Sequence, residues 1–287
     1  MKGIILAGGS GSRLFPLTKY VSKQLLPIYD KPMIYYPLGT LMLGGIKEIL
    51  IISDDQNINA YKKLFGNGSQ FGINLSYCVQ QKPNGIAEAF ILGEEFIGND
   101  NVTLILGDNI FHGENLQKLI CSSIDSTNNG KSVIVGHHVP DPERYGVAVI
   151  ENKKVVEIQE KPNNPKSDVA IVGLYFYTND VISKAKFLKP SDRGELEITD
   201  LNNLYIKENQ MEVSLMEEGF TWLDTGTFDS LHKASTFVKL LQKTSNYRLG
   251  LIDEIAFVNN FISKKQLKKN LLNLSYDFQK YLSDKYL

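Results

Sequence analysis

The chain has 287 residues, 43% hydrophobic and 22% charged. This composition is typical of one folded domain and excludes a disordered chain. Its 31 basic residues balance 32 acidic ones, which leaves no electrostatic basis for binding nucleic acid or an anionic membrane. The chain has two cysteines, no signal-peptide pattern and no apolar run near the ~18 residues of a membrane span. We therefore expect a soluble, cytoplasmic protein.

The first half of the chain alternates short apolar runs with helical patterns. Apolar runs that suit strands buried on both faces occupy residues 3–7, 49–52 and 103–106. Helical patterns cover residues 33–43, 58–65 and 86–97. This alternation predicts a doubly wound α/β fold with a mostly parallel sheet. Ligands of such sheets bind at the carboxyl ends of the strands, so Gly8, Gly9 and Asp108, which follow strands, are candidate site residues.

The second half of the chain has a different pattern. Strand patterns cover residues 145–150 and 155–160, as a hairpin, and residues 170–177; helical patterns cover residues 181–188, 196–208 and 228–242. Residues 241–287 suggest two or three short helices. Because no linker-like stretch marks a clean boundary, we expect a C-terminal helical appendage on one main domain.

A glycine-rich segment, Leu6-Ala-Gly-Gly-Ser-Gly-Ser-Arg-Leu14, follows the first strand. Glycines let the backbone approach a ligand and turn its N–H groups toward an anion. Arg13 adds a fork of donors, and Lys23 adds a compact positive charge. The segment predicts phosphate binding, with an ordinary glycine-rich turn as the alternative. It is neither a dinucleotide fingerprint, since position 14 is leucine, nor a P-loop.

Two aspartates follow short apolar pieces, Asp108 in Leu106-Gly-Asp-Asn109 and Asp224 in Trp222-Leu-Asp-Thr-Gly226. Two carboxylates that meet at a polyphosphate suit Mg²⁺, whose remaining ligands would be phosphate and water. Each aspartate alone could equally be a turn or cap residue. The sequence does not show whether the two meet in space.

Taken together, the motifs of this chain resemble those of the sugar-1-phosphate nucleotidylyltransferases, in particular the branch that transfers thymidylyl groups to glucose 1-phosphate. The matching segments, in chain order, are Gly3-Ile-Ile-Leu-Ala-Gly-Gly-Ser-Gly-Ser-Arg13, Ser22-Lys-Gln-Leu-Leu-Pro27, Asp30-Lys-Pro-Met-Ile-Tyr-Tyr-Pro37, Leu106-Gly-Asp-Asn109, Pro142-Glu-Arg-Tyr-Gly146, Glu160-Lys-Pro162, Arg193-Gly-Glu-Leu-Glu-Ile-Thr-Asp200 and Trp222-Leu-Asp-Thr-Gly226.

The resemblance implies a Rossmann-like core with an inserted sugar-binding β region, commonly in a homotetramer. Residues 1–240 would form the nucleotidyltransferase domain, with residues 1–138 mainly binding nucleotide, residues 139–226 mainly binding sugar and residues 241–287 as the appendage. The implied reaction converts dTTP and glucose 1-phosphate to dTDP-glucose and pyrophosphate. That reaction is the first step toward dTDP-linked deoxysugars such as rhamnose.

The resemblance also implies the role of each site residue. The triphosphate would contact Gly8, Gly9, Gly11, Ser12, Arg13, Lys23, Gln24 and Asp108, and the base Gln80 and Gly85. Asp108 and Asp224 would hold Mg²⁺. Glucose would contact Gly146, Glu160 and Ile171, and its phosphate Lys161 and Arg193. The catalytic set would be Arg13, Lys23, Asp108, Lys161 and Asp224. The chain departs from the family pattern at Ser12, usually Thr, at Ile171, commonly Val, and over Gln81-Lys-Pro-Asn84, usually Pro-Ser-Pro-Asp.

The implied chemistry needs no general base, because the sugar phosphate is already a competent nucleophile. Catalysis would consist of in-line positioning and neutralisation of charge on the α-phosphate. Two alternatives remain open. One is a UTP-dependent uridylyltransferase acting on a related sugar phosphate. The other is a non-catalytic nucleotide-sugar sensor, which should lack the paired carboxylates or the arginine that this chain has at Asp108, Asp224 and Arg13.

Overall fold

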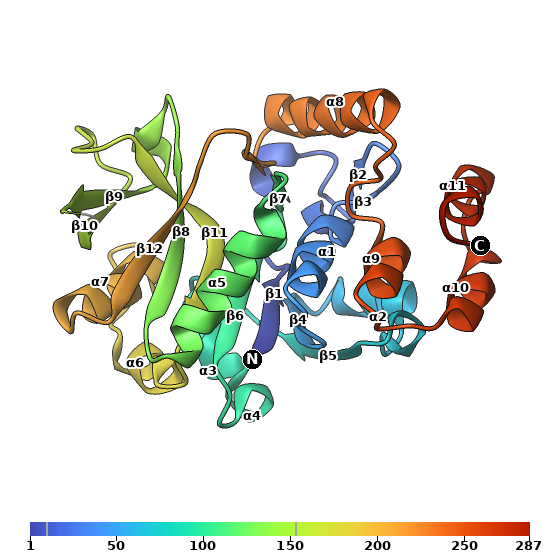
Figure 1. Ribbon diagram of the computed structural model, residues 1–287. Helices are drawn as coiled ribbons and strands as arrows, with labels where there is room; N and C mark the ends of the chain where they lie inside the picture. The colour runs from blue at the N-terminus through green and yellow to red at the C-terminus, as the bar shows by residue number, and fades with distance from the viewer. Residues whose placement is uncertain (10, 153) are drawn as a thin grey trace.

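A computed structural model describes residues 1–9, 11–152 and 154–287 (Figure 1). Its centre is a nine-stranded sheet with the order β10-β9-β11-β6-β1-β4-β5, in which β8 pairs with β11 and β12 pairs with β8. These strands are β1 (Lys2–Leu6), β4 (Glu48–Ser53), β5 (Asn74–Val79), β6 (Val102–Leu106), β8 (Ser132–His138), β9 (Gly146–Glu151), β10 (Lys154–Glu160), β11 (Val169–Tyr177) and β12 (Met211–Met216).

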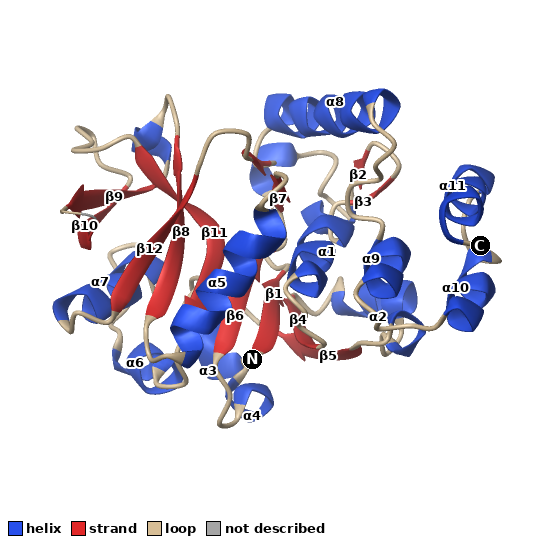
Figure 2. Ribbon diagram, in the orientation of Figure 1, coloured by secondary structure: helices blue, strands red, loops and turns tan. Residues whose placement is uncertain are grey.

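Short strand pairs and helices complete the fold (Figure 2). The short pairs are β2 (Pro27–Ile28) with β3 (Lys31–Pro32), and β7 (Asn109–His112) with β13 (Thr221–Asp224). The helices are α1 (Tyr35–Leu43), α2 (Ile58–Phe65), α3 (Glu88–Leu92), α4 (Glu94–Ile97), α5 (Leu116–Asn128), α6 (Val181–Phe187), α7 (Ile198–Lys207), α8 (Phe228–Thr244), α9 (Ile252–Val258), α10 (Lys264–Leu271) and α11 (Tyr276–Tyr286). No helix of the described part of the chain has the length and apolar character needed to cross a membrane.

The parallel strands bring the predicted site segments to one edge of the sheet. Strand β1 lies between β4 and β6 and is parallel to both, with Leu6 opposite Ile52 and Leu106. Strand β5 continues the parallel part beside β4. The carboxyl ends of these strands therefore lie side by side, and Gly8 and Asp108 lie close to one another there. The predicted doubly wound α/β fold is confirmed.

Antiparallel strands extend the sheet on the other side of β6. Strand β11 pairs antiparallel with β6, β8 and β9, and the predicted hairpin forms as β9 and β10. Strand β12 and helix α5, which the sequence patterns did not identify, fill this half together with β8. The helix predicted over residues 86–97 is broken at Gly93 into α3 and α4. A Cβ at Gly93 would lie 2.9 Å from Ala89 O and 3.0 Å from Ile4 Cδ1, so the chain packs closely on β1 at this glycine.

The sheet is buried on both faces, which explains the unbroken apolar runs. Ile4 and Ile5 are adjacent in β1 and both fully buried, but they belong to different hydrophobic clusters, because successive strand residues point to opposite faces. Helices α1, α5 and α9 contribute to the cluster of Ile5, and α3, α6 and α7 to that of Ile4.

The C-terminal segment is helical, as predicted, but it also contributes to the main core. Ile252, Ile255, Leu267 and Leu282 belong to the same cluster as Ile5. Helix α9 packs closely on α1, where a Cβ at Gly39 would lie 3.0 Å from Ile255 Cδ1. The last helices, α10 and α11, lie at the right edge of Figure 1, beside the C-terminus. This segment therefore buries apolar surface of the core.

Candidate active site

Three adjoining cavities form a cleft along the carboxyl ends of the parallel strands. The glycine-loop cavity has a volume of about 260 Å³, the β9–β11 cavity about 270 Å³ and the β5 cavity about 450 Å³. Arg13 and Asp108 line both of the first two cavities. Gly8, Gly9 and Lys23 line both the glycine-loop and the β5 cavities. The shared residues make the three cavities one continuous site.

Most of the residues that the resemblance implied are brought together here. The glycine-loop cavity is lined by Gly8, Gly9, Gly11, Ser12, Arg13, Lys23, Gln24 and Asp108. The β9–β11 cavity is lined by Arg13, Asp108, Gly146, Glu160, Lys161, Ile171, Arg193 and Asp224. Gln80 lines the β5 cavity. Gly85 lines none of these cavities.

Gly85 has a structural reason to be glycine. Its φ is +104°, and a Cβ would lie 2.4 Å from the backbone oxygen of Leu196. The backbone N–H of Leu196 donates to Asn84 O (2.6 Å), and Ala87 N–H donates to Leu196 O (3.2 Å). The loop after β5 is thus bound directly to the segment that precedes α7.

The glycine loop that follows β1 contains residues in the left-handed region. Gly9 has a φ of +108° and Gly11 a φ of +57°, conformations in which a side chain is strained. Around Gly9 a Cβ would meet no atom within 4 Å, so the requirement at this position is conformational. Successive residues in such conformations can direct their backbone N–H groups toward an anion.

Asp108 is anchored through both carboxylate oxygens. Lys23 Nζ forms an ion pair with Oδ2, and Asn109 Nδ2 donates to Oδ1 (2.9 Å). Burial favours the neutral acid, but the charge and hydrogen bond of Lys23 outweigh it, so that the pKa of Asp108 lies below its ordinary value. The carboxylate is therefore ionised and held in place.

Asp224 is brought to Asp108 by the pairing of β7 with β13. In this ladder Asp224 lies opposite Asn109, the residue after Asp108, and Thr225 Oγ1 donates to Asp108 O (2.9 Å). Burial and the negative charge of Asp108 raise the pKa of Asp224, against the opposing charges of Lys23, Arg13 and Arg144. The two carboxylates repel each other at the junction of two cavities.

This pair of carboxylates fits a divalent cation. Both provide hard oxygen donors, and a cation between them would relieve the repulsion that raises the pKa of Asp224. Within the described residues, no group of three or more His, Cys, Asp or Glu side chains could hold a metal ion. The protein would thus supply two carboxylates, and the other ligands would come from phosphate and water.

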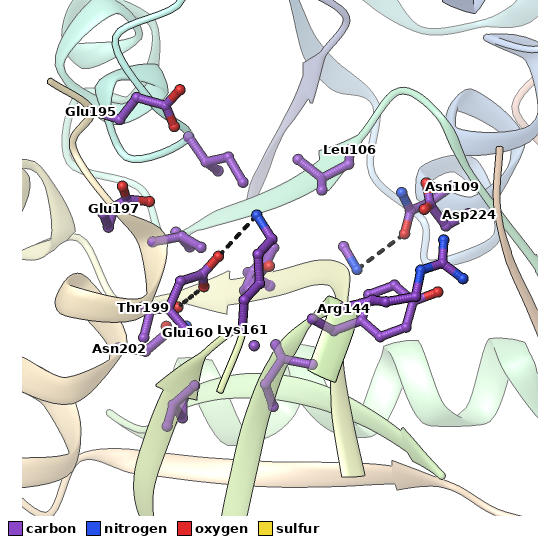
Figure 3. Close-up of a pocket in the computed structure, with 18 of the residues that line it drawn as sticks. Leu106, Asn109, Arg144, Glu160, Lys161, Glu195, Glu197, Thr199, Asn202 and Asp224 are labelled. Carbon is purple, nitrogen blue, oxygen red and sulfur yellow. Dashed lines mark hydrogen bonds and ion pairs between the residues drawn. The ribbon is translucent and has the colours of Figure 1, made fainter. Parts of the chain in front are cut away.

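The opposite wall of the β9–β11 cavity is a cluster around Glu160, at the end of β10 (Figure 3). Thr199 Oγ1 donates to Glu160 Oε2 (2.6 Å). Lys161 Nζ lies 3.3 Å and Arg193 Nη2 3.7 Å from Oε1. Gly146 lies opposite Glu160 in the β9–β10 ladder. Both cations are about half exposed (51% and 49%), so they can also reach an anion in the cavity.

Several residues that hold these groups were missed by the sequence analysis. Asn109 Oδ1 accepts from Trp222 Nε1 (2.6 Å) and Gly173 N (3.1 Å), which fixes the side chain that holds Asp108. Glu197 accepts two hydrogen bonds from Arg193 (3.2 and 2.9 Å). Arg144 carries a positive charge near Asp224. All lie within or beside the matching motifs, but only their contacts reveal these roles.

The opposite pKa shifts of the two aspartates predict opposite effects on stability. At neutral pH without metal, Asp108→Asn should lower the free energy of unfolding by about 1–3 kcal/mol, because it weakens charged hydrogen bonds to Lys23. Asp224→Asn should raise it, because a repelled charge is removed. Urea titrations measure both changes.

The pH dependence of these two effects follows from the direction of each shift. Because its pKa is lowered in the folded protein, Asp108 contributes stability above the unfolded-state pKa near 4, and this contribution is lost as pH falls. The difference in unfolding free energy between wild type and Asp108→Asn should therefore shrink in acid. Because the pKa of Asp224 is raised, its charged form destabilises the folded protein above the unfolded-state pKa. The gain in unfolding free energy of Asp224→Asn should therefore grow as pH rises above the unfolded-state pKa. Equal effects of both variants at every pH would contradict this account.

Comparison with known proteins places the chain in a family. A sequence model described as "Nucleotidyl transferase" matches residues 2–240. The chain is 52% identical over 270 residues, 94% of this chain and 93% of the relative, to a glucose-1-phosphate thymidylyltransferase of Neisseria meningitidis serogroup A. It is 48% identical over 280 residues, 96% of each chain, to the protein of the same name from Mycolicibacterium smegmatis.

Solved structures agree with these relationships. A crystal structure of a Bacillus anthracis protein assigned as a glucose-1-phosphate thymidylyltransferase, in complex with sucrose, aligns with a TM-score of 0.76 at 44% identity, covering 83% of this chain and 94% of that one. A UDP-glucose pyrophosphorylase complexed with UDP-glucose aligns with a TM-score of 0.74 at 24% identity, covering 85% and 99%. The latter similarity shows a shared fold alone. The chain therefore belongs to the nucleotidyl transferase family and, within it, to the glucose-1-phosphate thymidylyltransferases.

Proposed function

We propose that the protein transfers a thymidylyl group from dTTP to α-D-glucose 1-phosphate, giving dTDP-glucose and pyrophosphate as the first step toward dTDP-rhamnose and related deoxysugars. One observation carries this proposal: Arg13 and Asp108 line both the glycine-loop cavity and the β9–β11 cavity. A triphosphate in the first cavity and a sugar phosphate in the second would meet at these residues, beside Lys23 and Asp224.

The chemistry at this junction is phosphoryl-group displacement. A phosphate oxygen of glucose 1-phosphate attacks the α-phosphorus of dTTP, a new P–O bond forms, and the bond to the pyrophosphate leaving group breaks. Arg13 and Lys23 provide positive charge beside the glycine loop, where the triphosphate would lie. Lys161 and Arg193 hold the sugar phosphate, and Glu160 accepts hydrogen bonds from sugar hydroxyls. These residues act by positioning and by stabilising negative charge.

Asp108 and Asp224 would hold the metal ion, which we propose to be Mg²⁺. When bound, Mg²⁺ would neutralise charge on the phosphates and help to orient them. Asn109 would keep the Asp108 carboxylate in place through its hydrogen bond to Oδ1 (2.9 Å). The charges of Lys23, Arg13 and Arg144 oppose the rise in the pKa of Asp224 and so favour its ionised, metal-binding form.

Three further expectations remain predictions. We expect a cytoplasmic homotetramer that binds neither nucleic acid nor membranes. We also expect residues 1–138 to bind mainly the nucleotide and residues 139–226 mainly the sugar, and Gln80 and Gly85 to contact the base. Gly146 and Ile171 would contact the glucose. A uridylyl-transferring activity is the alternative, since thymine and uracil present the same amide edge.

The nucleotide preference tests the proposed activity directly. Pyrophosphate release should be fastest with dTTP and glucose 1-phosphate across a matrix of dTTP, UTP, CTP, ATP and GTP and several sugar 1-phosphates. UTP should be second, because a methyl group in an apolar pocket contributes only about 1 kcal/mol. A higher kcat/KM for UTP than for dTTP would establish the uridylyltransferase instead. No turnover with any pair would favour a nucleotide-sugar sensor.

Removal of either carboxylate should abolish most of the turnover. We expect Asp108→Asn and Asp224→Asn to lower kcat by about 10²-fold or more, because a metal clamp supplies several kcal/mol of charge stabilisation. Excess chelator should have the same effect on the wild type. Asp125→Asn, an exposed aspartate of α5, is the control. Near-normal turnover of both site variants would refute the metal assignment.

Lys161 should act on the sugar phosphate and not on the nucleotide. Lys161→Ala should raise the Kd for glucose 1-phosphate and lower kcat, while the Kd for dTTP, measured by calorimetry, changes little. Lys166→Ala is a matched control: Lys166 is similarly exposed (58%) but lies outside the residues that line the β9–β11 cavity. Equal loss of affinity for both substrates would show that the assignment of Lys161 is wrong.

A further inference from the structure

The side-chain amide of Gln80 is held against the start of the glycine loop. Gln80 follows β5 and is only 6% exposed, and its backbone N–H donates to Ser53 O (2.8 Å). A Cβ built on Gly8 would lie 3.1 Å from Gln80 Oε1. The amide oxygen is therefore directed to Gly8, and both residues line the β5 cavity.

The amide nitrogen of Gln80 faces the other way, to Glu88. Gln80 Nε2 donates to Glu88 Oε2 (2.8 Å), and Asn84 Nδ2 donates to Glu88 Oε1 (2.8 Å). Glu88 is the first residue of α3. Both carboxylate oxygens of Glu88 thus accept hydrogen bonds, and within the Gln80 amide only the nitrogen can donate one. A flipped amide would place the Gln80 oxygen against a carboxylate oxygen and lose the hydrogen bond.

We propose that Glu88 selects the base indirectly, by fixing Gln80 with its oxygen toward the β5 cavity. The inference rests on the proposed function, in that the base of the nucleotide contacts Gln80. An oxygen in that place accepts a hydrogen bond from a ring N–H, which thymine and uracil have at N3. Cytosine has a lone pair at N3, so two hydrogen-bond acceptors, this nitrogen and the amide oxygen of Gln80, would face each other. A buried polar group left unpaired in this way strongly disfavours the wrong ligand.

Glu88 is a positioning residue in this scheme. It lines none of the three cavities of the site, so it acts on the base only through Gln80. Its effect should then appear as a change in the choice between dTTP and dCTP. These two nucleotides share the deoxyribose and triphosphate, and their bases have similar sizes but different hydrogen-bonding edges.

The test compares wild type with Glu88→Gln, Glu88→Leu and the control Glu95→Gln, an exposed residue of the neighbouring helix α4. Calorimetry gives the Kd for dTTP and dCTP, and steady-state kinetics gives kcat and both KM values. A glutamine at position 88 can pair with either orientation of Gln80, and a leucine with neither. Both variants should reduce the dTTP-to-dCTP affinity ratio about tenfold or more. The KM for glucose 1-phosphate should stay unchanged.

The other possible results of this experiment either overturn the role of Glu88 or refute the proposed function. An unchanged ratio in both variants, or a wild type that binds dTTP and dCTP equally, would overturn the inference. So would an equal loss of affinity for both nucleotides with a lower Tm, because that pattern indicates a purely structural role. A wild type that binds dTTP selectively but transfers no thymidylyl group would refute the proposed function while the role of Glu88 in binding stands.

Discussion

The approach of two carboxylates, Asp108 and Asp224, is the constraint around which the site is arranged. The β7–β13 ladder forces them together at the end of a largely buried sheet, and their repulsion contributes to the raised pKa of Asp224. Charged side chains are present there because they offset this repulsion: Lys23 pairs with Asp108, and Arg13 and Arg144 act on Asp224. Such an arrangement opposes stability in the ligand-free protein, and the proposed cation with its polyphosphate would relieve the repulsion.

Backbone hydrogen bonds connect the loop after β5 to the segment before α7, on two sides of the cleft. Hydrogen bonds of Leu196 with Asn84 (2.6 Å) and Ala87 (3.2 Å) join the loop that carries Gln80 to the segment that carries Arg193. The close approach at Gly85 leaves no room for a side chain between them. In the proposed assignment, with the base at Gln80 and the sugar phosphate at Arg193, this link would set the distance between the two bound reactants, on which the reaction rate depends steeply.

Hydrogen-bonding neighbours define much of the chemistry of the individual site residues. Asn109 orients Asp108, Thr199 and the two nearby cations orient Glu160, and Glu88 orients Gln80. Each neighbour removes rotational freedom from a side chain that would face a ligand, so less entropy is lost when the ligand binds. The cleft is thus organised before any substrate enters it.

The sequence by itself determined the features that depend on local pattern. Residues 3–7 predict a buried strand because an apolar run without alternation suits burial on both faces. The glycine loop after it predicts a phosphate site because glycines let the backbone approach a ligand and turn its N–H groups toward an anion. The motifs also identified the family. The tertiary structure alone decided that Asp108 and Asp224 meet, that Leu196 packs on Gly85 and that Glu88 holds Gln80. Pairings between strands and contacts between distant loops leave no periodic signal in the chain, since they arise only when the sheet and its helices pack together.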